Sequence, residues 1–559
     1  MFMSAKTLII TTALLGQMAH AQLAQQVDGE FIVKLRDNRR VFSSASFIQI
    51  KKFTLGQDSY ALVRTNTVTD ETEALNALLQ LSGVEAAEVN QLVTAALPAP
   101  SVNLIENNYF NVQWGLANLG VNEPDLRGQP NQEPGWIGAD INAVAAWQVS
   151  RGSQQVKIAV LDTGVDYTHS ELSSNIWTNT QEIAANGIDD DQNGFIDDVH
   201  GWNAVENNGD PMDQLGQGTH IAGIIGALHN ETGVSGVMGE VSLVPVKIIS
   251  NQGTLTIADA LVGLDYAIRQ NVDVIQFSGR FTQPSTALNS LIQLAAAKKI
   301  AVTMGAGDSG LNTDEASGYP SALGNRNLYI FTAMSHQDTL ADFANFGRSS
   351  VFMAAPGQNI ISTAPRNNFA VRSGSTMAAA HAAGTIGLYI AQSGRQTPFQ
   401  LYSRLFATSV PGSSYELSVG SSSKLDAYNL LADIRPAHPV PPENNGVYYR
   451  LPSIIESAHP YANYSQIQHE IHIPGALGIR VIIKSMDIEL RYDWLRLHDS
   501  NNVMVQSLEG VANNFVSNEV LGDRVKISFY SDSSQTKWGY RIEAVYVRYP
   551  EIEESKKQK

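Results

Sequence analysis

A short apolar run ends in a carboxylate at residues 156–164, where the chain reads Val156-Lys157-Ile158-Ala159-Val160-Leu161-Asp162-Thr163-Gly164. Similar apolar runs occur at 272–275 and 300–303, and segments with helical spacing of apolar residues lie at 257–269, 285–299 and 377–390. Short apolar strands that alternate with helices are typical of a parallel sheet with helices on both faces. The sequence therefore predicts a doubly wound α/β domain over 105–432, in which ligands bind at the carboxyl ends of the strands.

Two further segments form a chemical pattern with Asp162. Gly216-Gln217-Gly218-Thr219-His220 places a histidine at the start of a small-residue helix, and Ser373-Gly374-Ser375-Thr376-Met377 places hydroxyl groups at the start of another. A carboxylate, a histidine and a hydroxyl in this chain order are typical of an acyl-transfer triad. In such a triad the carboxylate orients the imidazole, and the imidazole takes the proton of the hydroxyl.

Residues 105–432 resemble the peptidase domain of the subtilisin family, the subtilases, along nearly their whole length. Besides the segments above, the matching pieces are Gln113-Trp114-Gly115-Leu116, Asp140-Ile141-Asn142-Ala143 and Ala354-Ala355-Pro356-Gly357. The resemblance implies a serine endopeptidase that acts on polypeptides. It also implies that Asp162 is the orienting acid, His220 the general base and position 376 the nucleophile.

Two of the implied catalytic positions depart from the family pattern. Thr376 stands where the family has the serine of Gly-Thr-Ser-Met-Ala-x-Pro, and its extra methyl group and stiffer χ1 angle disfavour attack on a carbonyl. Asp308 stands where the family has the amide donor that stabilises the oxyanion; the loss of that donor costs roughly 10²–10³ in rate in subtilisin itself. A protonated Asp308 could still donate a hydrogen bond.

Other positions around the implied site also differ from the family. Gln217 replaces the first histidine of His-Gly-Thr-His, and Ala380 replaces the proline after the nucleophile. Ser278-Gly279-Arg280 stands where the family has Ser-Leu-Gly in the wall of the substrate cleft, so Arg280 could fill or charge a substrate pocket. Two hypotheses follow: a homologue with impaired or lost activity, or a working endopeptidase that uses Thr376.

The N-terminal segment predicts export. Residues 1–21 hold Lys6, the apolar run 8–15 and a final Ala19-His20-Ala21, which is the pattern of a cleaved signal peptide and is too short to span a bilayer. Residues 22–98 alternate strand and helix patterns and predict a small α+β unit. This unit resembles the inhibitor-type propeptide of the subtilases, which implies that it binds the peptidase domain of its own chain.

A second folded unit follows a proline-rich linker at 433–446. Residues 447–549 contain many short alternating runs and predict an all-β sandwich. They resemble a CUB-like domain without cysteines, which implies a protein or glycan ligand and leaves a third hypothesis, in which this domain is the functional unit. Residues 550–559 form a charged tail.

Acidic residues suggest two calcium sites. The run Asp189-Asp190-Asp191-Gln192-Asn193-Gly194 offers oxygen ligands at alternate positions before a glycine. The ligands predicted there are Asp189, Asp191, Asn193, Asp197 and Asp198. By the CUB-like resemblance, Glu489, Asp493 and Asp532 form the second set. The alternative at both places is a group of solvated carboxylates.

Composition excludes several classes of protein. With 37 Lys and Arg against 54 Asp and Glu, the net charge is −17, so no general attraction for nucleic acid is expected. The absence of cysteine excludes a disulfide scaffold and a cysteine nucleophile. No stretch approaches the roughly 20 apolar residues of a membrane span.

Overall fold

The computed structural model describes residues 25–36, 44, 46–66, 70–94, 108–120, 134–281, 283–314, 327–348, 350–415, 418–436, 448–473, 476–489, 492–533 and 536–548. The predicted signal peptide, most of the predicted linker and the charged tail lie outside these residues. Among the described residues, no helix is both long and apolar enough to cross a membrane.

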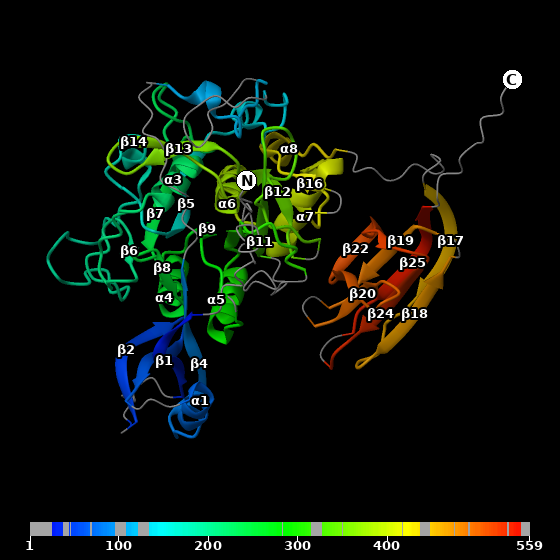
Figure 1. The fold of residues 1–559 in the computed structure, drawn as a ribbon, viewed down its shortest axis with the longest axis horizontal. Coiled ribbons are helices and arrows are strands. Elements are labelled where there is room, and N and C mark those ends of the chain that lie inside the picture. Colours follow the sequence, from blue (N-terminus) through cyan, green and yellow to red (C-terminus); the bar gives the residue numbers. More distant parts are fainter. Residues whose placement is uncertain are drawn as a thin grey trace, which may run out of the picture.

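The central domain is built on a nine-stranded sheet, and its fold confirms the α/β prediction (Figure 1). In sheet order the strands are β15 (Val410–Pro411), β16 (Ser423–Lys424), β12 (Met353–Pro356), β11 (Leu328–Met334), β10 (Ala301–Gly305), β9 (Val274–Phe277), β5 (Gly152–Asp162), β7 (Glu240–Lys247) and β6 (Trp202–Asn203). All neighbours pair in parallel except β15 and β16. Every residue of β9, β10 and β11 is buried, which explains why these strands are apolar throughout.

Helices cover this sheet in two packed pairs. Helix α3 (Gln217–Gly226) packs on α6 (Ser375–Ser393), and α4 (Ile257–Arg269) packs on α5 (Thr286–Ala297). Thr256 caps α4 and Ser285 caps α5, each by accepting a hydrogen bond from a backbone N–H of the first turn. Shorter elements complete the domain: η1 (Phe110–Val112), α2 (Ala143–Ala146), η2 (Ser173–Asn175), α7 (Pro398–Thr408), η4 (Ser413–Tyr415), α8 (Ala427–Ala432) and a hairpin of β13 (Ile360–Ala364) and β14 (Asn368–Arg372).

The N-terminal unit is a small α+β fold that shares a sheet with the central domain. Its elements are β1 (Gln25–Leu35), β2 (Phe47–Leu55), β3 (Asp58–Thr65), α1 (Glu71–Leu79) and β4 (Val84–Thr94). Strand β4 pairs antiparallel with β8 (Thr254–Thr256), which leads into α4. In Figure 1 this unit, drawn in blue, lies beside the ends of α4 and α5.

The C-terminal unit is all-β, as the alternating runs predict. One antiparallel sheet holds β17 (Tyr448–Glu456), β25 (Gly539–Arg548), β19 (Gly478–Asp487), β22 (Val511–Val516) and β23 (Val520–Leu521). The other holds β18 (Gln466–His472), β24 (Arg524–Tyr530), β20 (Trp494–His498) and β21 (Met504–Leu508). Inward residues of both sheets, Val481 and Leu497 among them, form one apolar core, as in a sandwich. Arg348 Nη1 of the central domain donates to Glu519 O of this unit at 3.3 Å.

Candidate active site

Asp162 ends strand β5 and lies fully buried at the carboxyl edge of the parallel sheet. Its Oδ1 accepts a hydrogen bond from Thr163 N at 2.6 Å, and its Oδ2 accepts one from Gln217 Nε2 at 2.9 Å. The Ser278 hydroxyl also bonds to this carboxylate. Burial raises the pKa of Asp162 to about 6, although the three hydrogen bonds act in the opposite direction.

Gln217 is the first residue of α3 and the side chain that faces Asp162. The helix begins here because Gly216 adopts φ +91°, which favours glycine, and because Asp213 accepts hydrogen bonds from the N–H groups of Gly216 and Thr219. The second amide atom of Gln217, Oε1, is buried and has no partner among the described residues. An uncharged amide thus occupies the place beside the carboxylate where a triad has its imidazole.

The predicted pairing of His220 with Asp162 is wrong. His220 lies three residues further along α3, about 4.5 Å along the helix axis, and is fully buried under the β13–β14 hairpin. Its Nε2 lies 3.0 Å from Ile360 O and 3.1 Å from Ala370 O, and its Nδ1 has no partner among the described residues. Burial lowers the pKa of His220 to about 3, so it stays neutral and packs in the core.

Thr376 is the second residue of α6 and is half-buried. Its hydroxyl makes one weak contact, from Oγ1 to Met377 Sδ at 3.4 Å. Within the described part of the chain, no histidine or other nitrogen base accepts its proton. The hydroxyl is therefore not activated in this arrangement.

Asp308 follows β10 and caps the start of α6. Its Oδ1 accepts a hydrogen bond from Ser375 N at 2.7 Å, while Gly307 N donates to Ser375 Oγ at 2.9 Å. Burial raises the pKa of Asp308 above its usual value, and the bonds from Ser375 oppose that rise. The carboxylate acts here as an acceptor at a helix N-terminus, not as the donor that an oxyanion needs.

Arg280 extends from the loop after β9 toward the loop after β10. A side chain at Gly307 would collide with Nη1 of Arg280, so the guanidinium lies directly against this glycine. Ser278 contacts Asp162 instead, and a side chain at Gly279 would collide with the ring of Phe277. Of the three residues predicted to line the wall of the substrate cleft, only Arg280 is charged. Its guanidinium lies between the loop after β9 and the loop after β10.

The acidic loop brings part of the predicted calcium set together and adds a residue. Carboxylate oxygens of Glu182, Asp189 and Asp191 lie within 4.8 Å of one another, and Asn193 Nδ2 donates to Asp191 Oδ2 at 3.1 Å. The sequence pattern did not predict Glu182 as a ligand, because it precedes Asp189 by seven residues. The fold brings its carboxylate to the acidic run.

Two other predicted ligands of this loop, Asp197 and Asp198, lie outside that group of three. Asp197 accepts hydrogen bonds from the N–H groups of Asn186 and Gly187. Asp198 is fully buried and accepts bonds from Tyr266 at 2.8 Å and Gln270 at 2.9 Å, which tie it to α4. The group that could hold a cation is therefore centred on Glu182, Asp189 and Asp191 rather than on the whole run.

The C-terminal sandwich brings all three of its predicted ligands together. One carboxylate oxygen from each of Glu489, Asp493 and Asp532 lies within 4.8 Å of the others. The Tyr461 hydroxyl donates to Asp493 Oδ2, and Asp493 Oδ1 accepts from Asp532 N at 3.0 Å. Three converging carboxylates in hydrogen-bonded positions suit a hard cation such as calcium.

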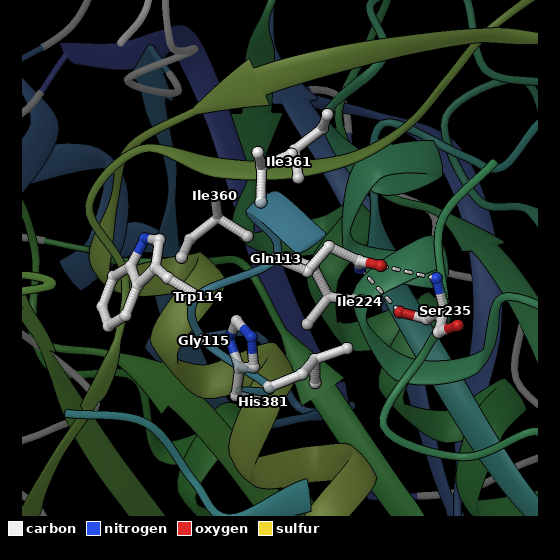
Figure 2. A pocket seen from close by; sticks show the side chains of 10 residues that line it. Gln113, Trp114, Gly115, Ile224, Ser235, Ile360, Ile361 and His381 are labelled. Atoms are coloured by element: carbon white, nitrogen blue, oxygen red, sulfur yellow. Dashed lines mark hydrogen bonds between the residues drawn. The ribbon is translucent and has the colours of Figure 1, made fainter. Parts of the chain in front are cut away.

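Figure 2 shows a small cavity between η1, α3, β13 and α6. Its volume is about 10 Å³, room for one water molecule at most, and Trp114, Ile360 and His381 line it. His381 Nδ1 lies 2.9 Å from Met377 O, so this histidine packs within α6. The cavity is part of the core and has no space for a peptide.

Comparisons with known proteins agree with this architecture. The sequence model described as Subtilase family matches residues 153–426. A thermophilic serine proteinase of Bacillus sp. (strain AK1) is 28% identical over 72% of this chain and 88% of its own length. Thermitase of Thermoactinomyces vulgaris is 34% identical over 45% of this chain and 80% of its own. Subtilisin-like protease 1 of Plasmodium berghei is 26% identical over 66% of this chain, and the match spans 62% of that protein.

Proposed function

The chain belongs to the subtilase family of serine peptidases, and we propose that it is an exported member that binds a polypeptide without hydrolysing it. The observation that carries this proposal is the hydrogen bond from Gln217 to Asp162. A general base must accept a proton in the transition state, and a neutral amide cannot do so near neutral pH.

The other two substitutions support the same conclusion. The Thr376 hydroxyl contacts a methionine sulfur rather than a base, and Asp308 presents a carboxylate where negative charge would develop. General-base catalysis contributes roughly 10²–10⁴ in rate, and loss of an oxyanion donor costs roughly 10²–10³. A working endopeptidase through Thr376 would need a base, and His220 is engaged under the hairpin.

Retention of polar groups favours binding over simple decay. Asp162, Gln217 and Asp308 keep hydrogen bonds that fix the starts of α3 and α6, so the loops at the carboxyl ends of the strands are held in position. The site therefore lacks a group that can take the proton of the Thr376 hydroxyl, but the positions of its loops are still fixed by hydrogen bonds. A polypeptide is the ligand class that the family membership favours.

The N-terminal unit fits the role of an inhibitor-type propeptide that stays in place. Glu88 accepts hydrogen bonds from Thr286 N at 3.0 Å and from the Ser285 hydroxyl at the start of α5. Asn90 Oδ1 accepts from Ala258 N at 3.1 Å at the start of α4. A chain without peptidase activity cannot cut itself between this unit and the central domain, so the unit remains attached.

Calcium binding is part of the proposal at two places. The groups Glu182, Asp189 and Asp191 in the central domain and Glu489, Asp493 and Asp532 in the CUB-like domain have the oxygen ligands that calcium prefers. The second group also favours a further candidate function, in which the CUB-like domain binds a protein or a glycan in the presence of calcium.

The test compares four purified full-length proteins: wild type, Gln217→His, Thr376→Ser and the double variant. Labelled casein serves as the substrate for turnover, and fluorescein-labelled decapeptides of random sequence serve as the probe for binding. We expect the wild type to bind peptides without cleaving casein. Because triad residues act as a unit, we expect neither single variant to cleave casein measurably. We expect the double variant to cleave casein at least about 10²-fold faster than the wild type.

Two results would contradict the proposal. One is casein cleavage by the wild type that Thr376→Ala abolishes, together with loss of residues 22–98 from the wild type alone in intact-mass measurements. The other is the absence of peptide binding by the wild type.

A further inference from the structure

The loops that follow β9 and β10 leave the sheet at the same edge. Strands β9 and β10 pair in parallel, with Val274 opposite Ala301, so their carboxyl ends lie side by side. Residues 278–280 continue from β9 and residues 306–308 continue from β10. We call these six residues the β9/β10 edge, which is the place where an α/β sheet binds its ligands.

Arg280 carries the positive charge of this edge. Its guanidinium lies against Gly307, whose φ of +101° and lack of a side chain leave the space that Nη1 occupies. The side chain is half-buried, so solvent reaches it. A ligand that enters the edge between the two loops therefore meets a guanidinium.

This guanidinium has no acceptor among the described residues, where it makes neither a hydrogen bond nor an ion pair. Arg269, Arg395 and Arg548, which are also partly buried, each contact a carboxylate: Asp265 at 2.6 Å, Asp273 at 2.5 Å and Glu519 at 2.8 Å. The acidic residue whose charge acts on Arg280 is Asp308, and the Oδ1 atom of Asp308 is already bonded to Ser375 N.

Burial without a partner is unfavourable for this cation. Desolvation lowers the pKa of Arg280, and Asp308 only partly opposes that effect. A guanidinium offers five N–H donors in a planar fork that matches a carboxylate with two parallel hydrogen bonds. A carboxylate brought by a ligand would supply the acceptor that the fold leaves out.

We propose that Arg280 binds a carboxylate of the bound polypeptide at the β9/β10 edge, so that this chain selects peptides with an acidic group at that position. The inference rests on the proposed peptide-binding function. The acidic group has two possible sources, a Glu or Asp side chain or the free C-terminus of the peptide, and the experiment separates them.

The experiment measures peptide affinity by fluorescence anisotropy with the full-length protein. The probes are fluorescein-labelled decapeptides of Ala, Ser and Thr that carry a single Glu at each position in turn, the matching Gln series, and one sequence with either a free or an amidated C-terminus. Because charge-assisted bidentate pairs are roughly twice as strong as neutral hydrogen bonds, we expect a preference of at least about tenfold for one Glu peptide over its Gln counterpart, or for the free C-terminus over the amide.

Variants assign that preference to Arg280. Arg280→Gln should abolish it, and Arg280→Lys should retain only part of it, because an ammonium keeps the charge but lacks the fork. Arg151→Gln changes the net charge equally at an exposed position and should leave the preference intact. Thermal unfolding should show that Arg280→Gln is at least as stable as the wild type, which establishes that the variant folds.

The outcomes separate this inference from the function on which it rests. If no peptide binds to the wild type, the peptide-binding function fails and the inference fails with it. If peptides bind with equal affinity whether or not they carry the acidic group, the inference alone is overturned. An acidic preference that persists in Arg280→Gln overturns it as well.

Discussion

The carboxylate of Asp162 destabilises the folded chain, and Asp162→Asn should therefore stabilise it. The carboxylate is fully buried, and its burial raises the pKa to about 6 from the 3.8 of a solvent-exposed aspartate. Asparagine has the same shape and stays neutral, and its Oδ1 can still accept from Thr163 N. Rotation of the Gln217 amide would let its unpaired Oε1 accept from the new Nδ2–H.

The magnitude follows from the two pKa values. At about 1.4 kcal/mol per pKa unit, a rise from 3.8 to about 6 corresponds to about 3 kcal/mol of destabilisation when Asp162 is ionised. The positive charges of Lys247 and Arg372 interact with Asp162, and both also interact with Asp213. These two cations therefore still have an anionic neighbour when Asp162 is replaced by asparagine. The gain at pH 8 should therefore be of this order, which corresponds to about 4 °C in Tm for a domain of about 330 residues.

The size of the stability difference between Asp162→Asn and the wild type depends on pH. Below about pH 3.8 the carboxyl is protonated in both the folded and the unfolded chain, so wild type and variant have equal stability from this source. Between pH 3.8 and about 6 the unfolded chain loses the proton first, so the wild type loses stability as the pH rises. The advantage of Asp162→Asn should thus grow across this window and stay constant above it.

Thermal unfolding of wild type and Asp162→Asn, followed by circular dichroism from pH 4 to 8, measures this difference. Asp342→Asn changes an exposed carboxylate and serves as the control, with no change in Tm expected. A variant that is less stable than wild type at pH 8, or a difference that does not vary with pH, would refute the reasoning. The first result would mean that the folded site stabilises the ionised carboxylate, as a working triad does; the second would mean that folding does not raise the pKa of Asp162.

Three further predictions concern the acidic loop around Asp191, the N-terminal unit and Asp308 at the start of α6. EDTA should lower the Tm of the wild type but have less effect on Asp191→Asn; an unchanged wild-type Tm would count against calcium. Glu88→Gln should weaken the cap of α5 by about 1 kcal/mol, measured as faster release of residues 22–98 under limited proteolysis than in Glu73→Gln, an exposed control. Because burial raises the pKa of Asp308, Asp308→Asn should raise Tm more at pH 8 than at pH 4; a loss of stability at pH 8 would contradict this.

Local patterns were sufficient to predict the parallel α/β class and three central strands of the nine-stranded sheet. The apolar run at 156–161 lies in β5, the runs at 272–275 and 300–303 overlap β9 and β10, and the helix expected at 257–269 is α4. These elements are apolar because both faces of the sheet are covered, so each run carries its own signal. The pairing of β4 with β8 joins segments more than 150 residues apart, and no local pattern marks it.

The residue beside Asp162 could not be identified from spacing alone. Gln217 and His220 are three residues apart on one helix, and both positions follow a glycine-rich turn that begins a helix. Histidine has the chemistry of a general base, so the residue type favoured His220. The actual assignment depends on where α3 begins relative to β5, and the cap formed by Asp213 fixes that point.

The residues that stand at the family's catalytic positions are relevant to whether this chain still binds a ligand there. A site under no selection would gain stability by replacing a buried carboxylate, because an apolar or neutral residue removes the desolvation penalty. Here Asp162 remains at the end of β5 with three hydrogen bonds, and the partner at position 217 is an amide that can donate to it. The same argument applies to Arg280, whose unpaired guanidinium lies at the β9/β10 edge beside Gly307. Groups that are unfavourable in the free protein persist most readily where a ligand compensates them, so the half-buried Arg280, unlike the fully buried Asp162, supports the proposed peptide-binding function.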